Sequence, residues 1–293
     1  MDSIRSKETS AFLEELGALH RQLAALPQDY DFDSPALLSH VLHFAAQPQR
    51  LRDYARTAIP ARIAILHHSW TMTTQSLIDA FLTGMEHRNP HSILLAARAQ
   101  LELYALVTTV IRVIKSNAGL HEDKFIDRVL AVDEALINAT FGTRYPGAKE
   151  QASQLGMSRL RKPNEADMKL FDAINIITRI KKAAVGSDYP TLFQDYELLC
   201  EFVHPNWGTN TLLVVPSPFG EPFRRFSLTS PAPFEGALGL AVGPMYRGAQ
   251  GIWSTTRKVE PPFGWSDLVQ LVKHRTIDLP NRATRRAARR KLK

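Results

Sequence analysis

Apolar residues recur every three or four positions along most of the chain, which is the spacing that places them on one face of an α-helix. The first such stretch covers residues 3–26, and its apolar positions are Phe12, Leu13, Leu16, Leu19, Leu23 and Leu26. A second helix is predicted over 59–84, where Pro60 is a favourable opening residue and Gly84 a favourable end. The segment 86–91, EHRNPH, is typical of a turn.

The stretch 92–116 is the most apolar helical segment, so we expect it to be the central helix of the fold. Another helix is predicted over 122–140, followed by a loop over 142–163 with few large apolar residues. Asn164 or Asp167 is expected to start the next helix. The apolar side of that helix would carry Leu170, Phe171, Ile174, Ile177 and Ile180. Further helices are predicted from Pro35, over 188–204, over 234–256 with a kink at Pro244, and over 265–277.

The pattern changes after His204, where the β-prone runs TNTLLVV and FRRFSLT are separated by PSPFGEP. Such runs with a turn between them predict a small hairpin or two extended arms. The sequence therefore predicts an all-α fold, an antiparallel helical bundle with a small β-hairpin-like insert after the His204 helix. We expect one helical domain over 1–280 and a separate tail over 281–293.

The positive charge of the protein lies in that tail. The chain has 36 basic and 29 acidic residues, a net charge of +7. Seven of the basic residues and no acidic residue lie in 281–293, and 36 minus 7 leaves 29 basic against 29 acidic residues in the body. The arginines at helical spacing are Arg282, Arg285, Arg286, Arg289 and Arg290. Such an arm binds phosphate backbones by charge, and the same composition is also typical of a disordered, solubilising tail.

Other features of the composition bear on where the protein resides. The single cysteine, Cys200, excludes an intrachain disulfide and fits a reducing compartment. The charged N-terminus lacks the apolar segment of a signal peptide. The uninterrupted apolar runs are much shorter than the roughly 20 residues of a membrane span. We therefore expect a cytoplasmic protein that does not enter a membrane.

Two charged residues interrupt the apolar face of the central helix. Arg98 and Glu102 lie four residues apart and therefore on one side of it. Buried charges are costly unless they are paired and hydrogen-bonded. The pair is therefore either an ion pair at the edge of the core or part of a functional polar centre inside the bundle.

A similar polar series lies on the helix that ends at His204. Tyr196, Cys200 and His204 follow one another at intervals of four residues. Cys200 and His204 could act as nucleophile and base, although a lone cysteine among apolar neighbours is typically a small buried hydrophobe. Because both polar series lie on faces that should turn to the core, we expect them to meet. Glu102 would then accept hydrogen bonds from Arg98 and from either Tyr196 or His204.

The segments that carry these residues resemble a known group of proteins. SILLAARAQLELYALVTTVIRVI and the later YELLCEFVHPN are similar to uncharacterised bacterial all-helical proteins, which carry an Arg-x-x-x-Glu helix and a later Tyr…His helix. The likeness covers about the middle half of the chain. Some members of that group are associated with phage defence. The resemblance implies a bacterial protein with Arg98, Glu102, Tyr196 and His204 as the positions of interest, and it implies no particular reaction.

A second resemblance concerns HEPN proteins (higher eukaryotes and prokaryotes nucleotide-binding), helical bundles of which many are ribonucleases. Their motif is an arginine followed by four to six residues and a histidine. Arg62 and His67 fit the spacing, but the four intervening residues are apolar and the polar residue that usually follows the arginine is missing. The residue pattern itself favours a helix-surface position for Arg62 and a core-edge position for His67.

The sequence indicates no metal site and no cofactor, because it has no cysteine cluster, no His-Glu-x-x-His and no glycine-rich phosphate fingerprint. Two functions remain as hypotheses. One is a protein that binds nucleic acid or a protein partner, with the basic C-terminal arm adding affinity. The alternative is a HEPN-like ribonuclease or defence toxin with His204 or His67 as acid and base. A homo-oligomer is left open.

Overall fold

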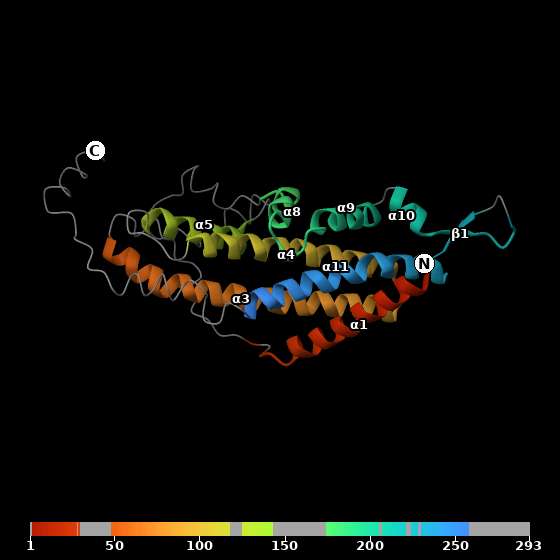
Figure 1. Ribbon diagram of the computed structural model, residues 1–293, viewed down its shortest axis with the longest axis horizontal. Coiled ribbons are helices and arrows are strands. Elements are labelled where there is room, and N and C mark those ends of the chain that lie inside the picture. The colour runs from red at the N-terminus through yellow and green to blue at the C-terminus, as the bar shows by residue number, and fades with distance from the viewer. Residues whose placement is uncertain are drawn as a thin grey trace.

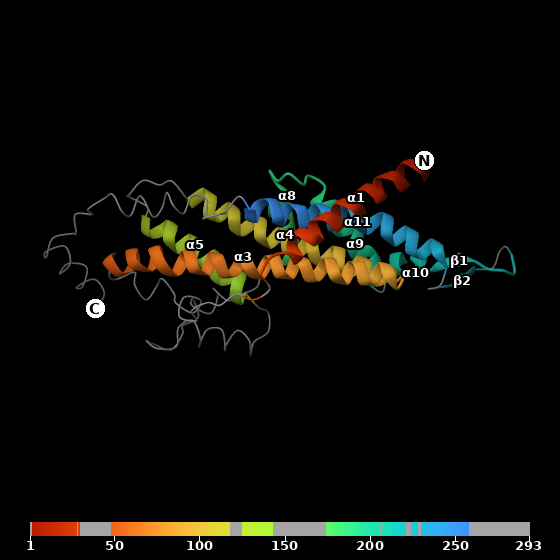
Figure 2. The same ribbon diagram turned by 90° about the horizontal axis from the view of Figure 1, so that it is seen from below.

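The computed structural model describes residues 2–27, 29, 48–117, 125–142, 174–204, 207–220, 224–227 and 230–257. Within these residues the fold is a bundle of helices with a single two-stranded hairpin, so the predicted all-α class is confirmed. Long helices run side by side along one axis, and the hairpin extends from one end (Figures 1 and 2).

Two long antiparallel helices form the base of the bundle. Helix α3 runs over Pro48–Glu86 and helix α4 over Pro90–Asn117, with the predicted turn between them. The Asn89 side-chain oxygen accepts hydrogen bonds from the backbone N–H groups of His91 and Ser92, each at 3.1 Å. This is N-terminal capping, which satisfies helix donors that have no partner within the helix.

Helix α4 is the central helix, as its apolar pattern predicted, because it packs against α3, α5, α8, α9 and α11. Its fully buried residues include Ile93, Leu94, Ala97, Leu101 and Val107. Helix α1 (Asp2–Ala24) packs against α3 and α11 and buries Leu16, Leu19 and Leu23.

Three shorter helices cover another side of α4 (Figure 1). They are α5 (Phe125–Phe141), α8 (Ile176–Ala184) and α9 (Leu192–Val203). Helix α9 ends where the sequence predicted, since His204 is its C-terminal cap and has extended backbone, but it begins at Leu192 and not at Asp188.

The last described part of the chain contains α10 (Trp207–Leu212), β1 (Val214–Pro216), β2 (Arg224–Phe226) and α11 (Pro231–Arg257). The antiparallel hairpin is confirmed, but it is shorter than predicted because α10 takes up most of the run TNTLL. Helix α11 packs closely on α4. A Cβ on Gly251 would overlap Tyr104 Cε2, and one on Gly248 would lie 3.1 Å from Gln100 Cγ. The glycines of α11 therefore permit a close contact between the two helices.

Two further predictions about the helices are wrong. Helix α3 does not open near Pro60 but begins at Pro48 and continues through that residue. An internal proline removes one helical hydrogen bond, and the packing of a 39-residue helix can offset that loss. The second error concerns the predicted apolar side, since Ile174 precedes the start of α8 at Ile176 and is exposed, and Ile177 is exposed within the helix. Of the predicted apolar side, Ile180 is fully buried.

Several predictions lie outside the described residues. They are the helix from Pro35, the loop over 143–163, the helix start at Asn164 or Asp167, the helix over 265–277 and the C-terminal arm.

Helix α4 also bears on the expected absence of a membrane span. By length and composition alone it is apolar enough to cross a membrane, and 56% of its most apolar window is buried inside the bundle. The central helix of a bundle shares these properties. The expectation that the chain does not enter a membrane therefore stays a prediction.

Candidate functional site

The polar residues of α4 and α9 meet, as their helical spacing predicted. Arg98 Nε lies 3.2 Å from Glu102 Oε1, and the Tyr196 hydroxyl donates to the same oxygen at 3.1 Å. Arg98 Nη1 lies 3.4 Å from His204 Nε2. We call Arg98, Glu102, Tyr196 and His204 the α4–α9 cluster. The contact between the four residues is confirmed, and the hydrogen-bond donor to Glu102 is Tyr196, while Arg98 forms an ion pair with it.

The α4–α9 cluster is open to solvent at one edge. The Arg98 side chain is 21% exposed and that of Glu102 is 35% exposed, whereas Tyr196 is buried and His204 is exposed. The cluster therefore lies at the rim of the core. Water can reach its charged groups, which lowers the energetic cost of holding an ion pair there.

Electrostatics keep Arg98 charged and Tyr196 protonated. Burial alone would lower the pKa of Arg98, but the hydrogen bond with Tyr196 and the electrostatic interactions with Cys200, Tyr196 and Glu102 outweigh it, so the pKa is raised. Burial raises the pKa of Tyr196, and the neighbouring Glu102 carboxylate adds to this against the opposing effect of Arg98. The Arg98 Cζ atom also lies 5.7 Å from the centre of the Tyr196 ring, which permits a cation–π contact. These interactions fix the orientation of the guanidinium.

The contact between Arg98 and His204 determines which form of the imidazole fits. A guanidinium has only donors, so Nε2 of His204 must accept, and the ring proton then resides on Nδ1. The Nε2 lone pair is therefore engaged by the Arg98 guanidinium in this arrangement.

A further cation lies near the α4–α9 cluster and was not among the candidates. Burial lowers the pKa of Arg179 on α8, and the charge of Glu102 acts in the opposite direction. Arg179 Nη2 donates to Asn138 Oδ1 at 3.2 Å, which links α8 to α5. Nothing in the local sequence distinguishes Arg179 from other basic residues, because only the packing of α8 on α4 brings it close to Glu102.

The weaker candidates Arg62 and His67 lie in different surroundings on α3. Arg62 is completely buried, so its predicted helix-surface position is wrong. Its Nη1 donates to Asp133 Oδ1 on α5 at 2.7 Å, and both side chains are 0% exposed. The core of the bundle thus supplies the carboxylate that makes a buried arginine tolerable. His67 is half-buried, in agreement with a core-edge position.

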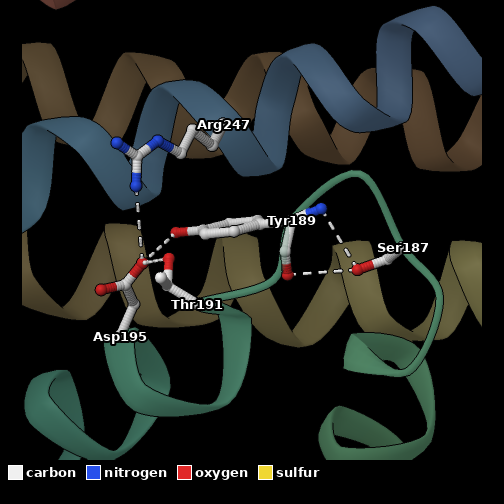
Figure 3. A network of polar contacts seen from close by, with 5 residues as sticks. All are labelled: Ser187, Tyr189, Thr191, Asp195 and Arg247. Atoms are coloured by element: carbon white, nitrogen blue, oxygen red, sulfur yellow. Dashed lines mark hydrogen bonds and ion pairs between the residues drawn. The ribbon is translucent and has the colours of Figure 1, made fainter.

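A second polar network fastens the start of α9 to α11 (Figure 3). Tyr189 and Thr191 donate to Asp195 Oδ2 at 2.7 and 2.9 Å, and Arg247 Nη1 lies 3.8 Å from the same oxygen. Burial, followed by the Asp195 charge, raises the pKa of Tyr189 and keeps its hydroxyl a donor. The network involves no residue of the α4–α9 cluster and serves to orient α9.

Two other features are a metal site, which the sequence does not indicate, and the C-terminal arm. In the described part of the chain, no group of three or more His, Cys, Asp or Glu side chains could hold a metal ion. The arginines of the C-terminal arm lie outside the described residues. Comparison of the chain with protein-family models, curated proteins and solved structures finds no match.

Proposed function

We propose that this protein binds nucleic acid, with the α4–α9 cluster contacting a phosphate and the C-terminal arm adding electrostatic affinity. The observation that carries the proposal is the pair formed by Arg98 and His204, whose nitrogens lie 3.4 Å apart at the open edge of the cluster. A fixed guanidinium beside an imidazole presents hydrogen-bond donors and positive charge to a phosphate oxygen.

The charge distribution supports the same function. The body of the chain is formally neutral, and the arm over 281–293 carries seven basic residues without an acid. Such an arm would attract any nucleic acid without reading its sequence. The C-terminal arm would first attract the nucleic acid, and the α4–α9 cluster would then bind one of its phosphates at a fixed position.

Deleting residues 281–293 should weaken binding to single-stranded RNA and make it less sensitive to salt. For single strands, log K falls by about 0.7 per neutralised phosphate for each decade of salt, so seven contacts give a slope of about 5. Fluorescence anisotropy across a salt series measures both the affinity and the slope. The melting temperature should change little, because the segment 281–290 has no large apolar residue to bury.

A chain with the five arm arginines changed to glutamine is the matched control, because it keeps the length of the arm. It should behave like the truncated protein. Tight binding by the truncated chain at physiological salt would contradict the role of the arm, and a fall in melting temperature of more than a few degrees would show that the arm is packed.

The Arg98–His204 contact also favours a second candidate function, a HEPN-like ribonuclease. In this proposal Arg98 turns from His204 Nε2 to the phosphate, and Nε2 removes the proton from a ribose 2′-hydroxyl. The resulting oxygen attacks the adjacent phosphorus, the bond to the 5′-oxygen breaks, and the departing 5′-oxygen takes up a proton from water. Arg98 holds the negative charge that develops on the phosphate oxygens. Glu102 and Tyr196 would position Arg98 without touching the substrate.

Under the ribonuclease candidate, His204→Ala should lower the rate of cleavage of a labelled single-stranded RNA by about 10²–10⁴-fold, the usual contribution of a general base. His91→Ala is the control, since that histidine lies on α4, the helix that carries Arg98 and Glu102, but outside the α4–α9 cluster. His67→Ala tests the weaker candidate. Absence of cleavage by the unmodified protein, together with unimpaired growth on expression, would reject this candidate and leave the binding function in place.

A further inference from the structure

The hairpin formed by β1 and β2 displays aromatic rings to solvent. Phe219 in the turn is 84% exposed and Phe226 on β2 is 68% exposed. The hairpin extends beyond the end of the helical bundle in both views (Figures 1 and 2). Single exposed apolar residues are common on protein surfaces, but two strongly exposed aromatic rings on one short hairpin point to a contact surface.

The register of the hairpin separates an inner from an outer face. Val215 is buried and pairs with Arg225, whereas Val214 pairs with Phe226 and Pro216 with Arg224. Because successive side chains on a strand point to opposite faces, Arg224 and Phe226 share the face opposite that of Val215. Helix α11 packs on β1, so the face of Arg224 and Phe226 is turned away from the side on which Val215 is buried.

The outer face combines the two chemical groups that bind a single nucleic-acid strand. An aromatic ring stacks on a base regardless of the base's identity, and an arginine contacts the backbone phosphate. Positions two apart on a strand are separated by about 7 Å, which matches the distance between a base and the phosphate beside it. The segment 214–227 has two arginines and one acidic residue, so its charge complements a phosphate chain.

The hairpin also lies close to the α4–α9 cluster along the chain. His204 ends α9, and only the short helix α10 separates it from β1. In Figures 1 and 2 helix α9, helix α10 and strand β1 follow one another toward the end of the bundle, so a single strand held at His204 would reach the hairpin by running past α10. Duplex nucleic acid would not offer its base faces to Phe219, because those faces are stacked inside the helix.

We propose that the β1–β2 hairpin is a binding arm for single-stranded nucleic acid, in which Phe219 and Phe226 stack on bases and Arg224 contacts a phosphate. This inference rests on the nucleic-acid-binding function proposed above and adds a subsite and a strand preference to it. The hairpin would supply the exposed stacking rings that the C-terminal arm and the α4–α9 cluster lack. The segment 281–293 contains no aromatic residue, and the Tyr196 ring of the α4–α9 cluster is buried.

The test compares three substitutions of Phe219 in the full chain, measured by anisotropy with a labelled single-stranded oligouridine at elevated salt. Phe219→Trp keeps a stacking ring and should bind at least as tightly as the unmodified protein. Phe219→Leu and Phe219→Ala remove the ring and should raise the Kd by about 5-fold to 100-fold. Val185→Ala is the control, because Val185 is an apolar residue elsewhere on the surface that is 73% exposed. It should leave the Kd unchanged.

The outcomes separate this inference from the proposed function. Failure of the unmodified protein to bind oligouridine would overturn both. Binding that is unaffected in Phe219→Leu and Phe219→Ala would overturn only the hairpin arm. Sedimentation with phosphatidylcholine–phosphatidylserine vesicles is a further measurement on the same variants. If Phe219→Ala abolished vesicle binding but left oligouridine binding intact, the hairpin would be a membrane-contacting element and the inference would be wrong.

Discussion

Replacing Arg62 with alanine should lower the free energy of unfolding by about 3–5 kcal/mol. Both side chains of the Arg62–Asp133 pair are 0% exposed, and Nη1 lies 2.7 Å from Oδ1. Removing the guanidinium would leave the Asp133 carboxylate in the core without the cation that compensates it, and the buried carboxylate is shielded from water. Because the pair joins α3 to α5, the contact between these helices should weaken as well. Urea denaturation measures the change.

Arg98→Ala is the matched control, since it also separates an arginine from a carboxylate. The Arg98–Glu102 side chains are 21% and 35% exposed, so water can solvate the remaining carboxylate. We expect a loss of about 1 kcal/mol or less and a protein that stays folded. Replacing both members of the buried pair, as Arg62→Met with Asp133→Leu, should recover most of the stability lost in Arg62→Ala. Equal effects of Arg62→Ala and Arg98→Ala would contradict this account.

The partial exposure of Arg98 and Glu102 bears on the choice between a structural and a functional α4–α9 cluster. If the cluster were purely structural and lay in the core, the protein would unfold when Arg98 is removed. A cluster at an accessible edge can lose Arg98 and remain folded, so the effect would appear in binding or cleavage instead. The geometry therefore makes the functional interpretation testable without loss of the fold.

The parts of the fold that the sequence predicted well are those in which one periodicity dominates. The apolar stripe of 92–116 required burial on several sides, and α4 is indeed surrounded by five other helices. The same logic predicted the α4–α9 cluster from spacing alone. Arg98 with Glu102 and Tyr196 with His204 each share a face at four-residue spacing, and both faces also carry residues that must be buried.

The remaining features depend on tertiary contacts that a local pattern does not contain. Arg62 resembles a surface residue in the sequence because its partner, Asp133, lies 71 positions away on α5. Arg179 approaches the α4–α9 cluster only through the packing of α8. The start of α3 at Pro48 was not predicted because a proline such as Pro60 is a usual opening residue, and the cost of placing it inside a helix is offset by packing along the helix.

The close contact between α4 and α11 gives the second large effect. At Gly251 a side chain would overlap Tyr104 Cε2 and lie 2.9 Å from Cδ2. Tyr104 is only 5% exposed, and its ring centre lies 5.9 Å from that of Tyr189, so the ring has little freedom to move aside. The Tyr104 ring therefore requires a glycine opposite it, and the distance between the two helices is set by that requirement.

Overpacking a core costs about 1–3 kcal/mol, and the preference of a helix for alanine over glycine returns up to roughly 1 kcal/mol. Gly251→Ala should consequently lower the free energy of unfolding by up to about 2 kcal/mol. Gly239→Ala is the control that measures the gain from alanine alone, because Gly239 lies on the same helix and a Cβ added there would meet nothing within 4 Å. Gly239→Ala should stabilise the protein by about 0.5–1 kcal/mol. In a Tyr104→Ala background, Gly251→Ala should cost little, since the ring it would strike is gone. If Gly251→Ala were as well tolerated as Gly239→Ala in urea denaturation, α4 and α11 could not be packed as closely as the structure has them.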